Sequence, residues 1–515
     1  MHIDARTLDN GSVVEGDLCI VGAGAAGISM AMEWIGASQR VILLEAGGFD
    51  YDPRMQELYR GDIVGLPYFP LQAARLHYFG GTTGHWAGFC STFDPIDFEP
   101  RDWVPHSGWP FKRAHLDPYY ARAHRVLELG PYEYDAAQWQ RRDPKLVPFP
   151  LDPSVVWTKM WQFSAPTRMG TRYRDVIVGA QNVHLYTNAI VREIDANEGA
   201  SAVDGLHVQT LDGKQLRVRA RHYVLAASTI QNARLLLASN GRVSAGLGNA
   251  NDLVGRFFME HLEMPSGVFV GLGDRAPDTA MYAFEWGRTK ARGELALTDA
   301  VQQRRRVLNA TVSLYPHGLD EAGQSTFQRM TPEVMAERRR VGDRALEAAA
   351  AARAATQQGG ADRAFHLQTR QEQAPNPASR VTLSTERDEL GMPRARLDWR
   401  LTELDRRSFR DFYDVLGREM GRAGVGRVQM RPWVLEKPDA PWPSSVGGGW
   451  HHMGTTRMHP DPKQGVVDPD CRVHGIANLS VAGAAVFPTA GAANPTLTLV
   501  ALTLRLSDHL KSKLG

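Results

Sequence analysis

Two polar residues near the C-terminal end of the chain are candidates for proton transfer. His451 lies in the glycine-rich stretch GGGWHHMGTTR, and Asn494 follows in the stretch GAANPTLT. A neutral imidazole accepts a proton well because its pKa lies close to physiological pH, and an amide donates a hydrogen bond without titrating. The apolar run after Asn494 predicts a long helix beginning near Thr496, whose free backbone N–H groups would face an electron-rich ligand. We therefore expect an imidazole and an amide beside one ligand.

Metal binding and serine hydrolysis are alternative uses of such residues, and the sequence argues against both. His451, His452 and His459 are the candidate metal ligands. Adjacent histidines in an extended segment point to opposite sides, and no cysteine or acidic partner stands at a familiar zinc spacing. No GxSxG stretch is present to carry a nucleophilic serine. We predict no metal site, and we interpret His452 as a hydrogen-bonded structural residue.

A glycine-rich turn at the opposite end of the chain predicts a dinucleotide site. Two short apolar strands, residues 18–21 and 41–44, flank a stretch compatible with a helix, and the turn between them carries GxGxxG at Gly22, Gly24 and Gly27. These glycines permit a tight turn, close approach of a pyrophosphate and close helix packing. Glu45 closes the second strand, where its carboxylate can accept hydrogen bonds from a ribose and would repel the 2′-phosphate of NADP. FAD and NAD both fit this unit. FAD is favoured because the unit stands at the start of a long chain, and much of the remaining sequence has to be explained as one assembly around the cofactor.

The rest of the chain shows a coarse organisation. Residues 51–130 are rich in aromatic residues, proline and glycine and predict ordered loops, whereas residues 182–225 predict a β-meander with a hairpin at Asp212 and Gly213. The meander should lead back into the nucleotide-binding sheet. The alanine-rich stretch 332–356 predicts one or two helices that end at Gly359 and Gly360.

Composition excludes several classes of partner. The 515 residues carry 59 Lys and Arg against 57 Asp and Glu, so a net charge of +2 gives no bulk attraction to nucleic acid or acidic membranes. The three cysteines are scattered, which predicts no disulfide framework. No apolar run approaches the roughly 18 residues of a membrane span, and the polar N-terminus does not read as a signal peptide. We expect a cytoplasmic protein.

Taken in order, these motifs resemble the glucose-methanol-choline (GMC) family of FAD enzymes, which oxidise alcohols. The resemblance extends over most of the chain through the N-terminal turn with Glu45, GGTTGHW, YVLAAS, LVGRFFMEH, SRVTLS and the C-terminal block. GGTTGHW and PTAGAANPTLT are most similar to pyranose oxidases and related bacterial sugar and glycoside oxidoreductases. The resemblance implies an α/β fold: a Rossmann-like FAD-binding domain from residues 1–255, with flavin-covering loops at 51–130, completed by residues 441–515. Residues 256–440 would form mainly a substrate domain on an antiparallel sheet with flanking helices.

The resemblance also implies roles for individual residues. It makes His451 the catalytic base and Asn494 its partner beside the flavin. His85 matches the histidine that carries the flavin covalently in pyranose oxidases, but Gly84 departs from their threonine, so covalent attachment, simple contact and a packing role all stay open. Phe258 and His261 are interpreted as fold-specifying. The other implied cofactor-binding positions are Gly81, Thr83, Val191, Gly483, Ala484 and Thr496.

The predicted activity is oxidation of a CH–OH group, a secondary hydroxyl of a sugar, glycoside or polyol, to a carbonyl. A hydride would pass to flavin N5 while His451 takes the hydroxyl proton. Two alternatives stay open: an oxidase or dehydrogenase of a nonpolar or aromatic alcohol or steroid, and a non-catalytic flavin-fold protein that escorts a lipidated partner. The electron acceptor (oxygen, a quinone or a redox protein) and the number of subunits are not predicted.

Overall fold

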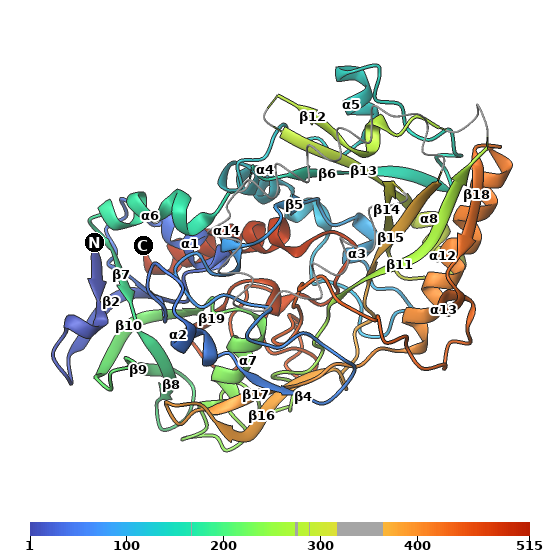
Figure 1. The fold of residues 1–515 in the computed structure, drawn as a ribbon. Helices are drawn as coiled ribbons and strands as arrows, with labels where there is room; N and C mark the ends of the chain where they lie inside the picture. The colour runs from blue at the N-terminus through green and yellow to red at the C-terminus, as the bar shows by residue number, and fades with distance from the viewer. Residues whose placement is uncertain (166, 273–276, 288, 317–363) are drawn as a thin grey trace.

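The chain folds around two large sheets that occupy separate halves of the molecule, with both termini beside the first (Figure 1). A computed structural model describes residues 1–165, 167–272, 277–287, 289–316 and 364–515. The helices expected over 332–356, with their end at Gly359 and Gly360, lie outside the described residues. A third, small sheet and the connecting loops join the two halves.

The first sheet has eight strands and contains the predicted βαβ unit. Its central parallel strands are β2 (Val13–Val21), β3 (Val41–Leu44) and β10 (Gln215–Leu225). All of β3 and the last four residues of β2 and β10 are buried, and these segments are mostly apolar, as expected for strands covered on both faces. The predicted hairpin is confirmed, because β9 and β10 pair antiparallel and Gly213 adopts a left-handed φ of 94° between them. In spatial order the strands are β1 (His2–Asp4), β7 (Val183–Thr187), β3 (Val41–Leu44), β2 (Val13–Val21), β10 (Gln215–Leu225), β9 (Val203–Gln209) and β8 (Ile190–Ala196), with β19 (Leu479–Val481) also paired to β10.

The second sheet has eight strands in the part of the chain that the structure describes, and the pairings among them are antiparallel. Helix α12 (Glu403–Arg422) covers part of it, with the Tyr413 hydroxyl 2.7 Å from the Thr369 hydroxyl on β15. Strands β5 and β6 come from before residue 255, so the sheets are interleaved along the chain; the division at residues 255 and 440 stays a prediction. The order is β18 (Gly426–Met430), β11 (His261–Gly271), β15 (Ala364–Glu372), β14 (Ala310–Pro316), β13 (Thr289–Leu297), β6 (Val156–Phe163) and β5 (Phe89–Cys90), with β12 (Phe284–Trp286) on β13.

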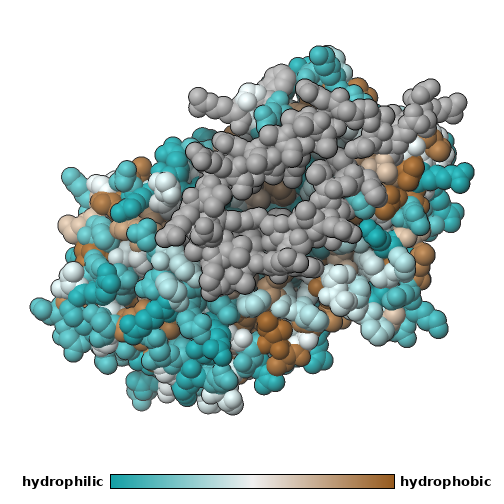
Figure 2. Space-filling model, viewed as in Figure 1, coloured by the Kyte–Doolittle hydropathy of each residue, from teal (hydrophilic) through white to brown (hydrophobic). Residues whose placement is uncertain are grey.

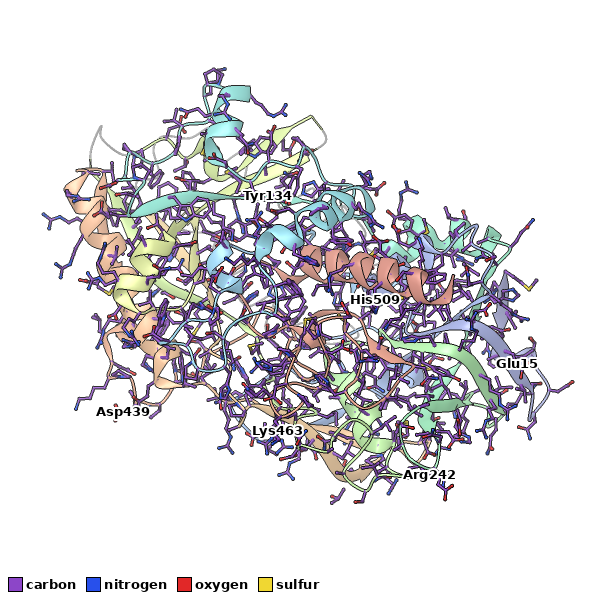
Figure 3. The ribbon with its side chains drawn as sticks, turned by 180° about the vertical axis from the view of Figure 1, so that it is seen from behind. Glu15, Tyr134, Arg242, Asp439, Lys463 and His509 are labelled. Carbon is purple, nitrogen blue, oxygen red and sulfur yellow. The ribbon has the colours of Figure 1, made fainter. Side chains whose placement is uncertain are left out.

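The long C-terminal helix α14 (Pro495–Leu514) begins one residue before the predicted start and packs against α1 and α4. Seen from behind, it crosses the middle of the molecule with His509 near its end (Figure 3). Its Thr498 hydroxyl lies 2.9 Å from the Tyr120 hydroxyl on α4. The third sheet contains β16 (Arg380–Arg387), β17 (Pro393–Asp398) and β4 (Gly61–Ile63). The other α-helices within the described residues are α1 (Ala25–Glu33), α2 (Pro53–Glu57), α3 (Pro95–Phe98), α4 (Asp117–Val126), α5 (Ala136–Arg142), α6 (Met169–Gly179), α7 (Thr229–Ala238), α8 (Asp299–Arg305) and α13 (Pro432–Leu435).

The coloured residues on the face shown in Figure 2 are of mixed polarity, with apolar residues scattered among polar ones. The three cysteines, Cys19, Cys90 and Cys471, are buried and free. Within the described ranges, no helix is both long and apolar enough to cross a membrane.

Candidate functional site

The glycine turn after β2 has the shape that a dinucleotide phosphate requires. A side chain at Gly22 would lie 2.7 Å from the Ala226 carbonyl oxygen, and one at Gly27 only 1.8 Å from the Gly22 carbonyl oxygen. A Cβ at Gly24, by contrast, would meet nothing within 4 Å, so the turn is open beside the N-terminus of α1. The turn thus leaves room for a pyrophosphate close to free backbone N–H groups, and these residues fit FAD.

Glu45 lies at the end of β3 next to this turn. Its carboxylate is buried and accepts hydrogen bonds from the backbone N–H groups of Ala23 and Gly47, both at 2.9 Å. Burial raises the pKa of this carboxyl group. The Ala189 N–H donates to the Glu45 backbone oxygen at 3.0 Å, so the strand that carries Val191 begins beside Glu45. Glu45 and Val191, two of the predicted cofactor positions, therefore lie close together.

The GGTTGHW loop packs directly on the glycine turn. The Gly80 N–H donates to the Ala23 oxygen at 2.8 Å, and a Cβ at Gly81 would lie 3.2 Å from the Gly24 Cα. The Thr83 hydroxyl donates to the Gly80 oxygen at 2.6 Å and so holds the loop in its 3-10 turn. The His85 ring centroid lies 5.7 Å from that of Trp450, the residue before His451. The loop thus connects the glycine turn to the C-terminal block.

The C-terminal block returns to the same place. Gly483 has φ 103°, and a Cβ there would lie 3.9 Å from the Ala26 Cβ in the first turn of α1. The Gly454 N–H donates to the Ala484 oxygen at 3.1 Å, which ties this turn to the HHMGTT segment. Thr496 lies half-buried in the first turn of α14. These contacts join the glycine turn, the GGTTGHW loop and the turn at Gly483 and Ala484, and the individual roles of the predicted cofactor positions stay predictions.

His451 and Asn494 lie within hydrogen-bond distance of each other. The Asn494 Nδ2 is 3.1 Å from the His451 Nε2, and the Trp161 indole N–H donates to the Asn494 Oδ1 at 3.0 Å. An indole nitrogen can only donate, so the amide oxygen must face Trp161 and the amide NH₂ must face His451. The His451 Nε2 therefore presents a lone pair to the amide. Burial, followed by the neighbouring His261, Arg370 and His452, holds the pKa of His451 well below its usual value.

The other side of His451 contacts a second histidine. The His261 Nδ1 lies 2.9 Å from the His451 Nδ1, while the His261 Nε2 lies 2.8 Å from the Gly491 oxygen and 3.2 Å from the Ala490 oxygen. The backbone is held as well, because the Glu260 Oε1 accepts the N–H groups of both His451, at 2.6 Å, and His261, at 2.9 Å. The imidazole of His451 is therefore fixed on two sides and through its main chain.

His452 points away from this centre, as expected for adjacent residues of an extended segment. Its Nε2 lies 2.8 Å from the Tyr68 hydroxyl, which donates a short hydrogen bond to Glu260. Burial lowers the pKa of His452 to about 3, so its ring stays neutral. These contacts support the structural interpretation of His452. Across the described ranges, no three His, Cys, Asp or Glu side chains are grouped to hold a metal ion.

Charged side chains from the second sheet border the same centre. The Glu263 Oε1 lies 3.9 Å from the His451 Nδ1 and accepts from the Arg370 Nε at 2.7 Å. Glu294, fully buried, pairs with Arg370 and with Arg292. Arg370 and Arg292 balance Glu263 and Glu294, so the network places polar groups beside His451 without a large net charge.

Sequence reasoning did not find Trp161, and it interpreted His261 as fold-specifying. The strand segment VWTKMWQF around Trp161 gives no signal of a link to Asn494, because the two residues are 333 positions apart. His261 stands in the motif LVGRFFMEH, which carried the family resemblance but no role in proton transfer. Both residues reach His451 or Asn494 only through long-range strand pairing.

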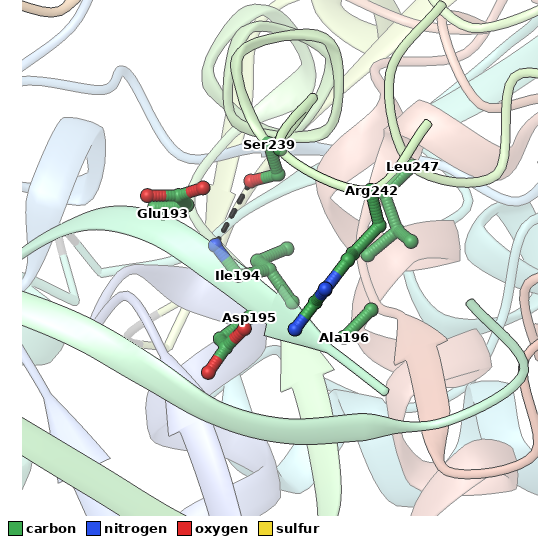
Figure 4. A pocket seen from close by; sticks show the side chains of 8 residues that line it. Glu193, Ile194, Asp195, Ala196, Ser239, Arg242 and Leu247 are labelled. Carbon is green, nitrogen blue, oxygen red and sulfur yellow. Dashed lines mark hydrogen bonds between the residues drawn. The ribbon is translucent and has the colours of Figure 1, made fainter. Parts of the chain in front are cut away.

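A small surface pocket of about 230 Å³ lies elsewhere, between β8 and the end of α7 (Figure 4). The Ser239 hydroxyl accepts the Ile194 N–H there at 2.9 Å, and Glu193, Asp195 and Arg242 supply the charged part of its lining. It shares no lining residue with the His451 centre. We assign this pocket no part in the chemistry.

Two family models and several known proteins match this chain. Residues 375–503 match the family model described as GMC oxidoreductase, and residues 17–244 match the model described as FAD dependent oxidoreductase. The chain is 24% identical to 2-methyl-1,2-propanediol dehydrogenase of Mycolicibacterium austroafricanum, covering 96% of this chain and 95% of that one. It is 25% identical to C-glycoside 3-oxidase of Microbacterium trichothecenolyticum, covering 87% and 77% respectively.

A solved structure has the same fold. The crystal structure of a pyridoxine 4-oxidase from "Mesorbium loti" matches with a TM-score of 0.55 and 18% identity, covering 96% of this chain and 99% of that one. The two family models match the segments that hold the glycine turn and the His451–Asn494 pair. The chain therefore belongs to the GMC oxidoreductase family and is an FAD-dependent oxidoreductase.

Proposed function

We propose that the protein oxidises a secondary hydroxyl of a sugar, glycoside or polyol to a carbonyl, with His451 as the base. The observation that carries this proposal is the His451–Asn494 pair, in which an unprotonated Nε2 faces an amide donor at 3.1 Å. Bound FAD would supply the acceptor for the hydride that leaves the carbinol carbon. The chain itself supplies the acceptor for the hydroxyl proton.

The two side chains act on the same hydroxyl group. The His451 ring is neutral at neutral pH, so its Nε2 lone pair is available for the substrate proton, and a general base contributes about 10² to 10⁴ in rate. The Asn494 NH₂ can donate to the oxygen as negative charge develops on it. Trp161 keeps that amide in the required orientation by occupying its oxygen.

The surroundings of His451 favour a polar substrate. The Glu263 side chain is 27% exposed and lies beside the His451 ring, with Arg370 paired to it. A hydroxyl-rich molecule can form hydrogen bonds with such groups, whereas a hydrocarbon would leave them without solvent. The relatives named for a diol and for a C-glycoside agree with a polar, hydroxyl-bearing substrate, and of these two only the C-glycoside has a secondary hydroxyl. A nonpolar or aromatic alcohol is the alternative.

Three further points belong to this proposal. His85 would contact the flavin, with covalent attachment as the stronger form of that contact. Residues 1–255 and 441–515 would hold FAD, and residues 256–440 would mainly bind substrate. The electrons would leave to oxygen, a quinone or a redox protein, and the protein would act in the cytoplasm.

An anaerobic substrate survey tests the proposal. FAD-loaded protein is mixed in a stopped-flow instrument with monosaccharides, glycosides, polyols, aromatic alcohols and steroids, and bleaching of the oxidised flavin is followed. We expect bleaching with at least one sugar, glycoside or polyol, and a ketone product by mass spectrometry. Bleaching by aromatic alcohols or steroids alone would select the alternative substrate class, and no bleaching by any of them would favour a non-catalytic protein.

A further inference from the structure

A row of hydrogen bonds crosses the centre from Trp161 to the backbone of the segment before α14. It passes through Asn494, His451 and His261 and ends on the Gly491 and Ala490 oxygens, with no distance above 3.2 Å. Each bond needs one donor and one acceptor, so the groups at the two ends decide the direction of every bond between them.

The His261 end of the row is fixed by backbone. Carbonyl oxygens can only accept, so the His261 Nε2 must carry the hydrogen that faces Gly491 and Ala490. Burial lowers the pKa of His261 to about 4, so its ring is neutral at pH 7 and its Nδ1 is left with a lone pair. That lone pair points at the His451 Nδ1 from 2.9 Å.

We propose that His261 is a positioning residue that holds His451 in the tautomer with hydrogen on Nδ1, leaving Nε2 free to take the substrate proton. The two ends of the row agree independently, because the amide orientation set by Trp161 also requires a lone pair on the His451 Nε2. The inference rests on the proposed function, since it explains why the Nε2 of the proposed base is unprotonated.

Glu263 is the competing partner for the His451 Nδ1. Its carboxylate oxygen lies 3.9 Å away, beyond hydrogen-bond distance, and is already paired with Arg370. The His261 Nδ1 is a full 1.0 Å closer than Glu263. The geometry therefore assigns the orientation of His451 to His261, as the carboxylate partner does for the histidine of a Ser-His-Asp triad.

Nitrogen NMR on the intact FAD-loaded enzyme tests this assignment without turnover. Long-range ¹H–¹⁵N correlation spectra of ¹⁵N-histidine protein distinguish a protonated from an unprotonated ring nitrogen, and the His451 signals are those lost in His451→Gln. We expect a protonated Nδ1 and an unprotonated Nε2 at pH 7. The opposite tautomer in the wild-type enzyme would overturn the inference, and this result does not depend on any variant folding.

Variants supply the second readout. In His261→Leu, which cannot accept from Nδ1, we expect a mixed or reversed tautomer and flavin reduction slower by about 10-fold to 10³-fold, with substrate Kd unchanged. His261→Asn, whose Oδ1 can accept, should recover most of the rate. The matched control is His222→Leu, which removes another buried histidine bonded through Nε2, to the Ser480 hydroxyl at 3.0 Å, and should leave rate and tautomer unchanged.

The outcomes separate this inference from the proposed function. If His451→Ala slows flavin reduction while His261→Leu retains the wild-type rate and tautomer, His451 stays the base and the role of His261 is wrong. If the His451→Ala variant reduces the flavin at the normal rate, the proposed function itself is contradicted. A His261→Asn variant as slow as His261→Leu, with the His451 tautomer unchanged in both, would also overturn the inference.

Discussion

At the scale of single residues, the candidate site depends on groups whose hydrogen-bonding sense cannot change. The indole N–H of Trp161 is a donor only, and it therefore decides which end of the Asn494 amide faces His451. Without it, the amide could rotate and turn its oxygen toward His451, where two acceptors would face each other and the NH₂ donor would be lost. Trp161 therefore determines which atom of the Asn494 amide faces His451.

Trp161→Phe should slow substrate reduction of the flavin by about tenfold, because one buried hydrogen bond, worth about 1.4 kcal/mol, no longer holds the amide. The rate is measured by anaerobic stopped-flow at saturating substrate. Trp103→Phe is the matched control, since it removes an indole bond of 3.0 Å to the Val307 oxygen outside the site. Equal rates in both variants and the wild type would show that the amide does not depend on Trp161.

The sequence was sufficient for the residues that carry a local motif. The pairing of His451 with Asn494, and the opposite direction of the His452 side chain, could be predicted because each residue lies in a short, distinctive stretch. Trp161 and His261 could not be assigned roles, because their contacts form only after β6 and β11 take their places in the second sheet. Nothing in the nearby sequence encodes that register.

At the scale of elements, local units were predictable and their assembly was not. The strand at 41–44, the Asp212–Gly213 hairpin and the C-terminal helix follow from apolar periodicity, turn chemistry and the helix start at Pro495. The second sheet, however, pairs β13 with β6 and β11 with β15 across long stretches of chain. Such pairings depend on which apolar faces remain to be buried, which a linear pattern does not specify.

At the scale of the whole molecule, buried histidines should control stability in acid. Burial lowers the pKa of each to between about 3 and about 4 in the folded protein; these residues are His77, His124, His222, His261 and His452. Their unfolded pKa is about 6.5, so below that pH the unfolded chain binds more protons, and stability falls as pH falls. Each contributes up to about 1.4 kcal/mol per pH unit.

Buried carboxyl groups oppose this trend but are fewer. Burial raises the pKa of Glu260 to about 8, of Asp97 to about 7 and of Asp405 to about 6. Between these values and their lower pKa in the unfolded chain, the folded protein binds more protons, so these groups add stability as pH falls. We therefore expect a net loss of stability from pH 6.5 to pH 5, seen as a falling Tm at constant ionic strength. His222→Leu should make the slope shallower, and a Tm that is constant or rises over this range would contradict the balance.

The central claim is that His451 takes the substrate proton at a bound FAD, and its most direct test is single-turnover flavin reduction in His451→Ala. We expect reduction at least about a hundredfold slower than in the wild-type enzyme, with FAD content unchanged. His452→Ala, which removes the adjacent buried histidine, should reduce the flavin at close to the wild-type rate. Near-normal reduction in His451→Ala, or a collapse confined to His452→Ala, would contradict the account.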